Sequence, residues 1–560
     1  MNQIRVTELS RDPAVAMIVA DERIQAEAQT LPTGITRIGS TVTPIAKIDG
    51  IDERVDADVA IVDTGIAPVA DLNVAGGYNC STSDRAMWRD VEGHGTHVAG
   101  TVAAIDNGAG VVGVAPGARL WAVKILTDSG DGLLSWYVCG LDWIAAQRDA
   151  GDPTRPMIEA VNMSVAKSGR DDANCGKTNS DILHAAICRL VASGVTVVAA
   201  AANDSSSAAA RVPAAYNEVI TVSALADTDG KAGGLGGHKC YSWGTYDVDD
   251  TFADFSNYGS DVDLIAPGKC IWSTVPSGYG YSSGTSMAAP HVTGAVALLK
   301  ASRPGLTPAE VREALQYLGT MNWKTATDPD PYHERLLDVP RIGPRGDFSI
   351  AAGPDASLSE AGGPAGIPIT ITRSATSFER IRLSVSGLPG GASATFNPTS
   401  LYGFTGVATT LTVTMPFGTR PASYPITIRA DEHGNAQTTT ATVEVVADIP
   451  VARPPTTAVR AKATLGTTTV PTVVFWPAAT DSSGITAYEI QVRVDGGTWR
   501  AAGTTGSAVR SMLASQAVGK AYQYRVRARD GVGTWGAWAE APAVGGLFVQ
   551  DRSSAVVYRG

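Results

Sequence analysis

Residues 284–291 read GTSMAAPH and open a strongly apolar helical pattern that continues through residues 292–299. Ser286 follows the Gly-Thr turn, and we expect Pro290 in the first helical turn, where a missing N–H does little harm. This position exposes one hydroxyl at a helix N-terminus, where the helix dipole favours developing negative charge. The same pattern also fits a serine that caps the helix with its side chain, so other segments have to decide between nucleophile and cap.

Two upstream segments carry the groups that would activate a serine. Residues 59–65 (VAIVDTG) are an apolar run that leads into Asp63, as in a buried parallel strand with a carboxylate at its carboxyl end. Residues 93–100 (GHGTHVAG) begin a second helical pattern and contain His94. A serine nucleophile needs an imidazole to take its proton and a carboxylate to hold that imidazole. Alone, Asp63 fits a turn and His94 a packing position, but with Ser286 they predict a catalytic triad.

These motifs, in the order Asp63, His94, Ser286, resemble the subtilase (subtilisin-like, family S8) serine peptidases. The resemblance makes His94 the base, and activity is then expected to rise with pH as this imidazole loses its proton near neutrality. It also assigns Asn203, at the end of the apolar residues 195–203, to the oxyanion, together with the backbone N–H of Ser286. We therefore expect a secreted serine endopeptidase that hydrolyses peptide bonds through an acyl-enzyme.

The same resemblance gives nearby polar residues structural roles. His97 follows the base by three positions and His291 lies close to the nucleophile in the chain, and both are expected to pack. Asp90, four residues before the base, is expected to support the loop that carries His94.

The resemblance places substrate-binding residues on residues 162–167 (NMSVAK) and just before Asn203: Ser164, Val165, Ala166, Ala201 and Ala202. Both segments depart from the family, which usually has a Gly-Gly pair in the first segment and a glycine in place of Ala202. Each added methyl group narrows a place where the substrate approaches the backbone closely. We therefore expect a tight primary pocket that favours small or medium apolar side chains.

A calcium site is implied by residues 104–111 (AIDNGAGV), which match a family loop that interrupts the helix carrying the base. Calcium takes six to eight oxygens, and backbone carbonyls serve as well as side chains. By position the ligands would be Gln29, Asp71, Ile105, Asn107, Ala109 and Val111. The alternative is an ordinary acidic turn. No organic cofactor is expected.

Composition limits the partners. A net charge of −11 and a pI near 5.2 argue against nucleic-acid binding, and no apolar run approaches the roughly 20 residues that span a bilayer. The six cysteines lie between Cys80 and Cys270 without metal-ligand spacing, which favours disulfides and an oxidising compartment. Spacing leaves many pairings open, as well as free thiols, but the resemblance implies three bridges: Cys80–Cys139, Cys175–Cys188 and Cys240–Cys270.

The chain is long enough for several domains. We expect the end of an inhibitory propeptide at residues 1–28, in a chain that begins inside its prodomain and shows no complete signal peptide. A peptidase domain follows at residues 29–345. It is expected to be a doubly wound, mainly parallel α/β sheet with strands at residues 120–126, 158–163 and 195–202 and helices at 133–147, 181–193 and 308–318.

Short alternating strands then predict an immunoglobulin-like sandwich at residues 346–448 and a fibronectin type III-like sandwich at 456–560, joined by a proline-rich linker. In the second module the strand arginines fit a solvated face. Trp499, Trp535 and Trp538 fit packing positions or, alternatively, a platform for sugars or peptides.

We expect a monomer that takes protein and peptide substrates and its own propeptide as inhibitor. The alternative from another class is an adhesive or matrix-binding protein with a weak or inactive protease domain, which the two β modules and the two lost glycines favour and the intact motifs oppose. A lipase or esterase does not fit, because the Gly-x-Ser-x-Gly elbow is missing and the triad order differs.

Overall fold

The structure is a computed structural model that describes residues 11–15, 28–237, 248–403, 407–460 and 468–542. The chain forms two compact units, Met1–Gly346 and Asp347–Gly560. Most of the predicted propeptide segment, residues 1–28, lies outside the described residues. Within the described residues, no helix combines the length and apolar character needed to cross a membrane.

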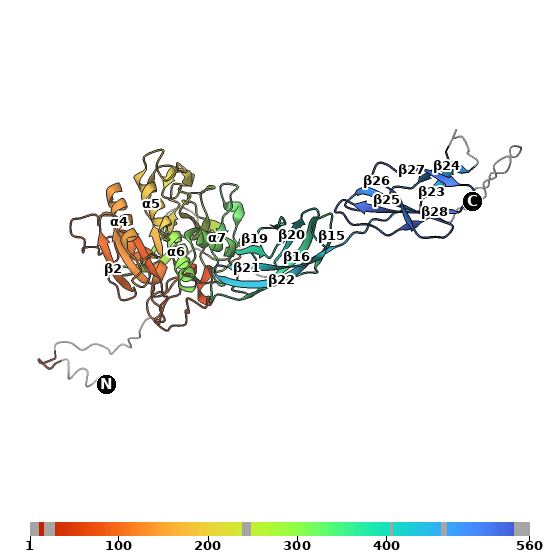
Figure 1. Cartoon of the computed structure of the whole chain (residues 1–560). Helices are drawn as coiled ribbons and strands as arrows, with labels where there is room; N and C mark the ends of the chain where they lie inside the picture. The colour runs from red at the N-terminus through yellow and green to blue at the C-terminus, as the bar shows by residue number, and fades with distance from the viewer. Residues whose placement is uncertain (1–10, 16–27, 238–247, 404–406, 461–467, 543–560) are drawn as a thin grey trace. The chain divides into compact units, whose positions relative to one another are not determined.

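A twisted parallel sheet organises the first unit (Figure 1). Its buried strands are continuous apolar runs, as expected where helices cover both faces of a parallel sheet. One short strand, β9 (Thr251–Phe252), runs antiparallel beside β8. The parallel strands lie in the order β13 (Arg335–Leu336), β10 (Leu264–Pro267), β8 (Ile220–Ala226), β6 (Thr196–Ala200), β4 (Ala160–Met163), β1 (Asp58–Asp63), β3 (Arg119–Lys124) and β2 (Val74–Asn79).

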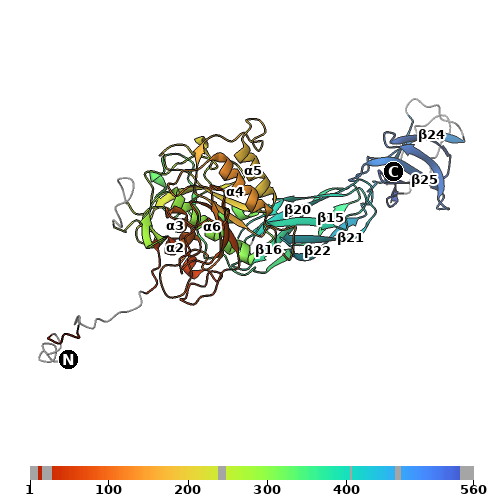
Figure 2. The same cartoon turned by 90° about the vertical axis from the view of Figure 1, so that its left-hand side faces the viewer.

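Helices lie on both faces of this sheet (Figures 1 and 2). On one face α4 packs against α5, and on the other α3 packs against α6. Two small antiparallel pairs complete the unit: β11 (Ile271–Val275) with β12 (Gly278–Ser282), and β5 (Lys167–Ser168) with β7 (Arg211–Val212). The helices are α2 (Thr33–Arg37), α3 (His94–Ala103), α4 (Leu134–Ala146), α5 (Ile182–Ala192), α6 (Thr285–Ser302) and α7 (Pro308–Leu318), with short 3₁₀ turns η1 (Ser40–Val42), η2 (Ala208–Ala210) and η3 (Thr325–Thr327).

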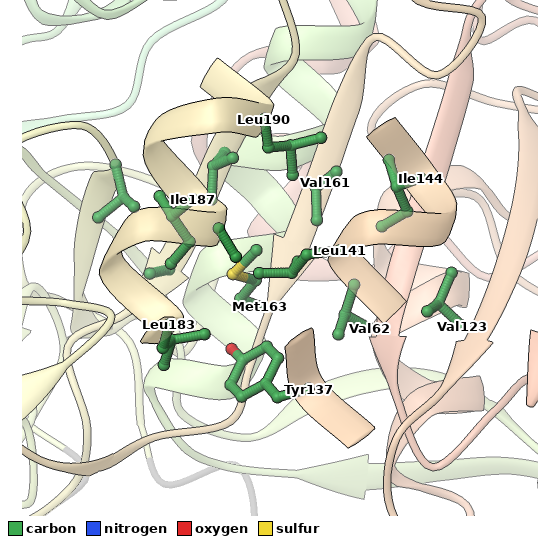
Figure 3. Packing of buried hydrophobic residues seen from close by; sticks show 14 of the residues in the cluster. Val62, Val123, Tyr137, Leu141, Ile144, Val161, Met163, Leu183, Ile187 and Leu190 are labelled. Carbon is green, nitrogen blue, oxygen red and sulfur yellow. The ribbon is translucent and has the colours of Figure 1, made fainter. Parts of the chain in front are cut away.

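The core between the sheet and the α4–α5 layer is drawn in Figure 3. Leu141 and Ile144 of α4 and Leu190 of α5 belong to one buried cluster with Val62 and Val161, which lie on the neighbouring strands β1 and β4. All five side chains are at most 1% exposed. This packing fixes where the strands end, and the carboxyl ends of the strands carry the candidate site.

The predicted α/β fold is confirmed. The expected strands at residues 120–126, 158–163 and 195–202 correspond to β3, β4 and β6, and the expected helices at 133–147 and 181–193 to α4 and α5. The helix predicted at residues 308–318 is α7, which begins with a capping box between Thr307 and Glu310.

Two of the predicted disulfides are present, Cys80–Cys139 and Cys175–Cys188, with Cα–Cα distances of 6.0 and 5.8 Å. Cys270 is also disulfide-bonded. Its predicted partner, Cys240, lies outside the described residues.

The second unit contains two all-β sandwiches, as predicted. Alternating apolar residues of the facing sheets make a separate core in each sandwich, such as Ile369 and Ile428 in the first and Val474 and Ile490 in the second. The first sandwich pairs β14 (Phe348–Ala352), β16 (Gly363–Arg373), β20 (Val407–Met415) and β18 (Ser393–Asn397) against β15 (Ala356–Ser359), β22 (Asn435–Val446), β21 (Ala422–Glu432), β17 (Ile381–Ser386) and β19 (Ser400–Leu401). The second pairs β23 (Thr456–Val459), β24 (Thr469–Phe475) and β27 (Ser511–Ala517) against β26 (Arg500–Gly506), β25 (Ile485–Val494), β28 (Tyr522–Asp530) and β29 (Ala539–Glu540).

The tryptophans of the second sandwich stack on arginines instead of presenting a free platform. The guanidinium of Arg525 lies 4.3 Å from the ring centre of Trp499 and 4.5 Å from that of Trp538. Arg527 lies 4.6 Å from Trp538 and 4.9 Å from Trp535. The arginine face is therefore partly solvated, as predicted, and cation–π contacts with the tryptophans half-bury the side chains of Arg525 and Arg527.

Candidate active site

Three neighbouring parallel strands end at one edge of the central sheet and bring the predicted site residues together. Asp63 is the last residue of β1, Ser164 follows β4, and Asn203 follows β6 by three residues. In the sheet, β4 lies between β1 and β6. Because parallel strands share their carboxyl edge, residues far apart in the chain meet there.

Asp63 and His94 form the centre of the site. Asp63 is fully buried, and its Oδ1 lies 2.8 Å from Nδ1 of His94, whose side chain is 29% exposed. Since a carboxylate can only accept, Nδ1 carries a proton, and in the neutral imidazole Nε2 is then the proton acceptor.

The electrostatics of His94 differ from the expectation of a near-neutral titration. Burial by itself lowers the pKa of His94, but the carboxylates of Asp63, Glu92 and Asp90 outweigh burial and raise it from its usual 6.5 to about 9. The imidazolium form of His94 is therefore favoured up to alkaline pH. Such stabilisation is what a base needs when it takes up a proton during the reaction.

The loop and the helix around His94 are held by the residues expected to support them. Oδ1 of Asp90 accepts the N–H of Gly93 at 2.9 Å, and its Oδ2 accepts the N–H and hydroxyl of Thr96. His97 and His291 are buried, and burial lowers the pKa of each to about 4. Their ring nitrogens contact backbone carbonyls, so both pack as neutral side chains.

Ser286 is the second residue of α6, and Gly284 occupies the N-cap position. The alternative that Ser286 caps the helix is therefore wrong. Its hydroxyl donates to the carbonyl of Ser164 at 3.4 Å, and no described hydrogen bond joins it to His94. Long or absent catalytic hydrogen bonds are common without substrate and tighten in the reacting complex.

Pro290 lies inside α6 and not in its first turn, contrary to expectation. It is the sixth residue, so the carbonyl of Ser286, four residues earlier, cannot receive its helical N–H. The hydroxyl of Ser164 donates to this carbonyl at 3.1 Å, and Nδ2 of Asn162 donates to Ser164 at 2.9 Å. Ser164 thus replaces the hydrogen bond that Pro290 removes, a role that the predicted substrate contact did not include.

Asn203 is oriented by Thr285. Its Oδ1 accepts the backbone N–H of Thr285 at 2.8 Å and the hydroxyl at 3.0 Å. Because an N–H can only donate, the amide group facing it must be the oxygen, and Nδ2 faces elsewhere. A Cβ added at Gly284 would lie 3.4 Å from this Nδ2 and 3.6 Å from the backbone nitrogen of Ser286. The two nitrogens therefore lie beside the same space next to Gly284.

The alanine that replaces a family glycine adopts a backbone conformation suited to glycine. Ala202 has φ +77°, in the left-handed region that L-residues with a Cβ adopt at a cost. Its N–H donates to the hydroxyl of Thr285 at 3.1 Å, and its carbonyl accepts from Asn257 at 3.0 Å. Contacts on both sides therefore hold Ala202 in this conformation.

The other expected substrate residues lie on the segments that follow β4 and β6. Ala201 is fully buried, Val165 is half-buried and Ala166 is exposed. Directly after Ala166, the chain pairs through β5 with β7, so this edge is already ordered as extended backbone.

The structure brings four of the six expected calcium ligands together. Nε2 of Gln29 donates to the carbonyls of Ile105 and Val111 at 2.9 and 3.1 Å, so these two oxygens converge on one point. Oδ2 of Asp71 accepts the N–H of Val111. Burial raises the pKa of Asp71, partly opposed by that N–H and by the hydroxyl of Tyr279. Converging carbonyls and a desolvated carboxylate are a donor set that fits calcium.

Asn107 and Ala109 are exposed residues of the same loop. The Asn107 amide oxygen accepts the N–H of Ala109 at 3.0 Å. Within the described part of the chain, no hydrogen bond joins either residue to Gln29 or Asp71.

Comparison with known proteins agrees with this geometry. A family model described as the subtilase family matches residues 56–320. Subtilisin NAT of Bacillus subtilis subsp. natto is 35% identical over 325 residues, which cover 57% of this chain and 74% of that protein. Subtilisin DY of Bacillus licheniformis is 37% identical over 302 residues, covering 52% and 93%. A solved cold-adapted subtilisin-like serine proteinase aligns with 56% of this chain and 99% of its own, at 27% identity and a TM-score of 0.42. Since the match spans nearly the whole of a subtilisin, the chain belongs to the subtilase family of serine endopeptidases.

Proposed function

We propose that this chain cleaves peptide bonds with Ser286 as nucleophile, His94 as general base and Asp63 as the carboxylate that holds the base. The observation that carries the proposal is the 2.8 Å contact between Nδ1 of His94 and the buried Asp63. It leaves Nε2 as the proton acceptor at a sheet edge that also carries the start of α6. The position of Ser286 near the N-terminus of that helix supports its role, because the dipole there favours an alkoxide.

The proposed reaction proceeds through an acyl-enzyme. Nε2 of His94 takes the hydroxyl proton of Ser286 as the oxygen attacks the scissile carbonyl, and Asp63 stabilises the imidazolium that forms. Nδ2 of Asn203 and the N–H of Ser286 hold the oxyanion. His94 then gives its proton to the leaving amine, and water attacks the acyl-enzyme by the same route in reverse.

We propose that the substrate binds as an extended strand along Ser164, Val165 and Ala166. The methyl groups of Ala166 and Ala202 would narrow the pocket for the side chain before the scissile bond. Small or medium apolar side chains would then be preferred. Faster cleavage after Phe than after Ala or Leu would contradict this specificity.

We propose a structural calcium ion at the loop of residues 104–111, held by Asp71, Gln29 and the loop oxygens. Gln29 would turn its amide so that Oε1 faces the ion. When bound, calcium supplies positive charge that offsets the desolvated carboxylate and ties the N-terminal arm to the loop. Loss of one bound calcium ion per chain in Asp71→Asn tests this site.

The setting of the enzyme is also a proposal. The two disulfides support secretion into an oxidising environment. We propose that the protein works as a monomer, that a propeptide ending near residue 28 inhibits it, and that the mature peptidase spans residues 29–345. The sandwiches at 346–448 and 456–560 would be immunoglobulin-like and fibronectin type III-like modules.

The first test is labelling with a fluorophosphonate probe in calcium-containing buffer. Labelling should occur in the parent chain and in Ser282→Ala, a control four residues earlier, and disappear in Ser286→Ala. Unchanged labelling in Ser286→Ala would refute the assigned nucleophile. Absence of labelling in folded, matured parent protein would favour the adhesive alternative.

A further inference from the structure

Tyr137 is a buried residue of the peptidase unit that takes no part in the proposed reaction. It is the fourth residue of α4 and is 5% exposed. Its ring belongs to the core cluster that also contains Met163 and Leu183, and Figure 3 shows it at the edge of that cluster. A buried tyrosine needs a hydrogen-bond partner for its hydroxyl, because an unpaired buried polar group is costly.

The partner of this hydroxyl lies on the segment along which we propose that the substrate binds. The hydroxyl of Tyr137 donates to the backbone carbonyl of Val165 at 3.2 Å. Val165 follows β4 by two residues and is half-buried against the same cluster. This one side chain therefore ties the backbone just beyond β4 to α4.

Two successive carbonyls of this segment are held by two different helices. The carbonyl of Ser164 accepts the hydroxyl of Ser286 in α6 at 3.4 Å, and the next carbonyl, that of Val165, accepts from α4. Since each peptide unit is planar, two fixed carbonyl directions restrict how the backbone between them can rotate. Shortly afterwards the chain enters β5, which pairs with β7. Tyr137 thus holds the segment between two anchored ends.

We propose that Tyr137 is a positioning residue, whose hydroxyl keeps the backbone of residues 164–166 in the shape on which an extended substrate docks. This inference rests on the proposed function, since it takes the substrate to lie along that segment. Ala166 is the exposed residue of the segment. A backbone that is ordered beforehand loses less conformational freedom when the substrate binds. Tyr137 would act only through Val165, without touching the reacting atoms.

The hydroxyl remains a donor over the whole range in which the base titrates. Burial, and then the charge of Asp63, raise the pKa of Tyr137 well above its usual 10. Because the pKa of His94 is about 9, the two groups do not lose their protons together. The loss caused by removing the hydroxyl should therefore be the same at every pH up to 9. A residue that acted on Asp63 or His94 would instead move the pH–rate profile.

The test compares two peptide substrates that share one cleaved bond and differ in length before it, one residue against four. In the parent chain, kcat/KM for the long substrate should exceed that for the short one, because only the long substrate reaches along residues 164–166. In Tyr137→Phe, which keeps the ring, this advantage should shrink about 2–10-fold, the worth of one hydrogen bond, mainly through a higher KM. The kcat/KM for the short substrate and the pH–rate profile should stay unchanged.

Tyr424→Phe is the matched control. The hydroxyl of Tyr424 also donates to a backbone carbonyl, that of Arg420 at 2.8 Å, but in the first sandwich. The control should therefore leave the cleavage of both substrates unaffected. Tyr137→Met, which fills the space with a flexible apolar side chain, repeats the test should Tyr137→Phe fail to fold.

Backbone hydrogen exchange gives a second readout that does not depend on activity. With Ser286→Ala in every chain, the N–H groups of residues 166–168 should exchange faster in Tyr137→Phe than in the parent or in Tyr424→Phe. Equal exchange in all three chains would contradict the positioning role.

An undiminished advantage of the long substrate in Tyr137→Phe and Tyr137→Met would overturn the proposal. An equal loss on both substrates would also overturn it, because the effect would then lie at the reacting groups. Failure of the proposed function gives a different result, since the parent chain itself would not be labelled by the fluorophosphonate probe and would cleave neither substrate.

Discussion

Replacing Ala202 by glycine should stabilise the protein, although it removes a side-chain methyl group. At φ +77°, a residue with a Cβ is strained by roughly 1–2 kcal/mol relative to glycine. Glycine also lowers the stability of the folded state by about 0.4–1 kcal/mol, because it makes the unfolded chain more flexible. The net gain expected for Ala202→Gly is therefore about 0.5–1 kcal/mol.

The matched control is Ala201→Gly, one residue earlier. Ala201 has no positive φ, is fully buried, and its N–H donates to the carbonyl of Val222 at 3.0 Å. Loss of its methyl costs about 0.8 kcal/mol, and glycine flexibility adds about 0.5–1 kcal/mol. Ala201→Gly should therefore be destabilised by about 1.5 kcal/mol.

The assay compares thermal unfolding of both variants with calcium present and Ser286 changed to alanine. For a unit of this size, these energies correspond to a rise of about 1 °C for Ala202→Gly and a fall of about 2 °C for Ala201→Gly. The test depends on the two variants shifting the unfolding temperature in opposite directions. In the active chain, Ala202→Gly should also raise kcat/KM for substrates with Phe before the bond relative to those with Ala. Equal destabilisation of the two variants would refute the strain at Ala202.

Three further predictions concern the site. Because the pKa of His94 is raised to about 9, kcat/KM should rise with pH up to about that value as the base becomes neutral. The raised pKa of His94 also contributes folding stability, which is fully present below pH 6.5 and is lost as the pH rises through about 9. A pH–rate profile that levels off near pH 7 would contradict the raised pKa. Asn203→Asp keeps the acceptor for Thr285 but loses the Nδ2 donor, so kcat should fall about 10²–10³-fold, a magnitude carried over from a subtilisin, with unfolding unchanged. Ser164→Ala leaves the Ser286 carbonyl without a donor and should lower the unfolding free energy by about 1–3 kcal/mol, measured in denaturant; no loss would mean that water replaces the hydroxyl.

Much of the first unit could be predicted from local patterns. An apolar run that reaches the sheet edge at Asp63 reads as a buried strand wherever it lies, and Thr307 with Glu310 marks the start of α7 by itself. These signals depend on backbone geometry and on neighbours within a few residues. Strand and helix positions therefore followed from the sequence, and a family resemblance added the roles of the site residues.

Other features could not be predicted, because they depend on contacts distant in the chain. The position of Pro290 inside α6 depends on where the helix starts, and Ser164, far away in sequence, accounts for its tolerance. The arginines of β28 read as a solvated face until the rings of Trp499 and Trp538 are placed beside them.

The sequence by itself determined which side chains are available and where each strand and helix that carries them lies, since hydrophobic periodicity and capping act locally. The tertiary structure decided how those side chains behave. Strand order puts β4 between β1 and β6, and this brings Asp63, Ser164 and Asn203 to one edge. The carboxylates beside His94 raise its pKa against the effect of burial, and contact with Thr285 decides which way the amide of Asn203 faces. Both effects arise from the surroundings that the completed fold creates, and a linear pattern does not contain them.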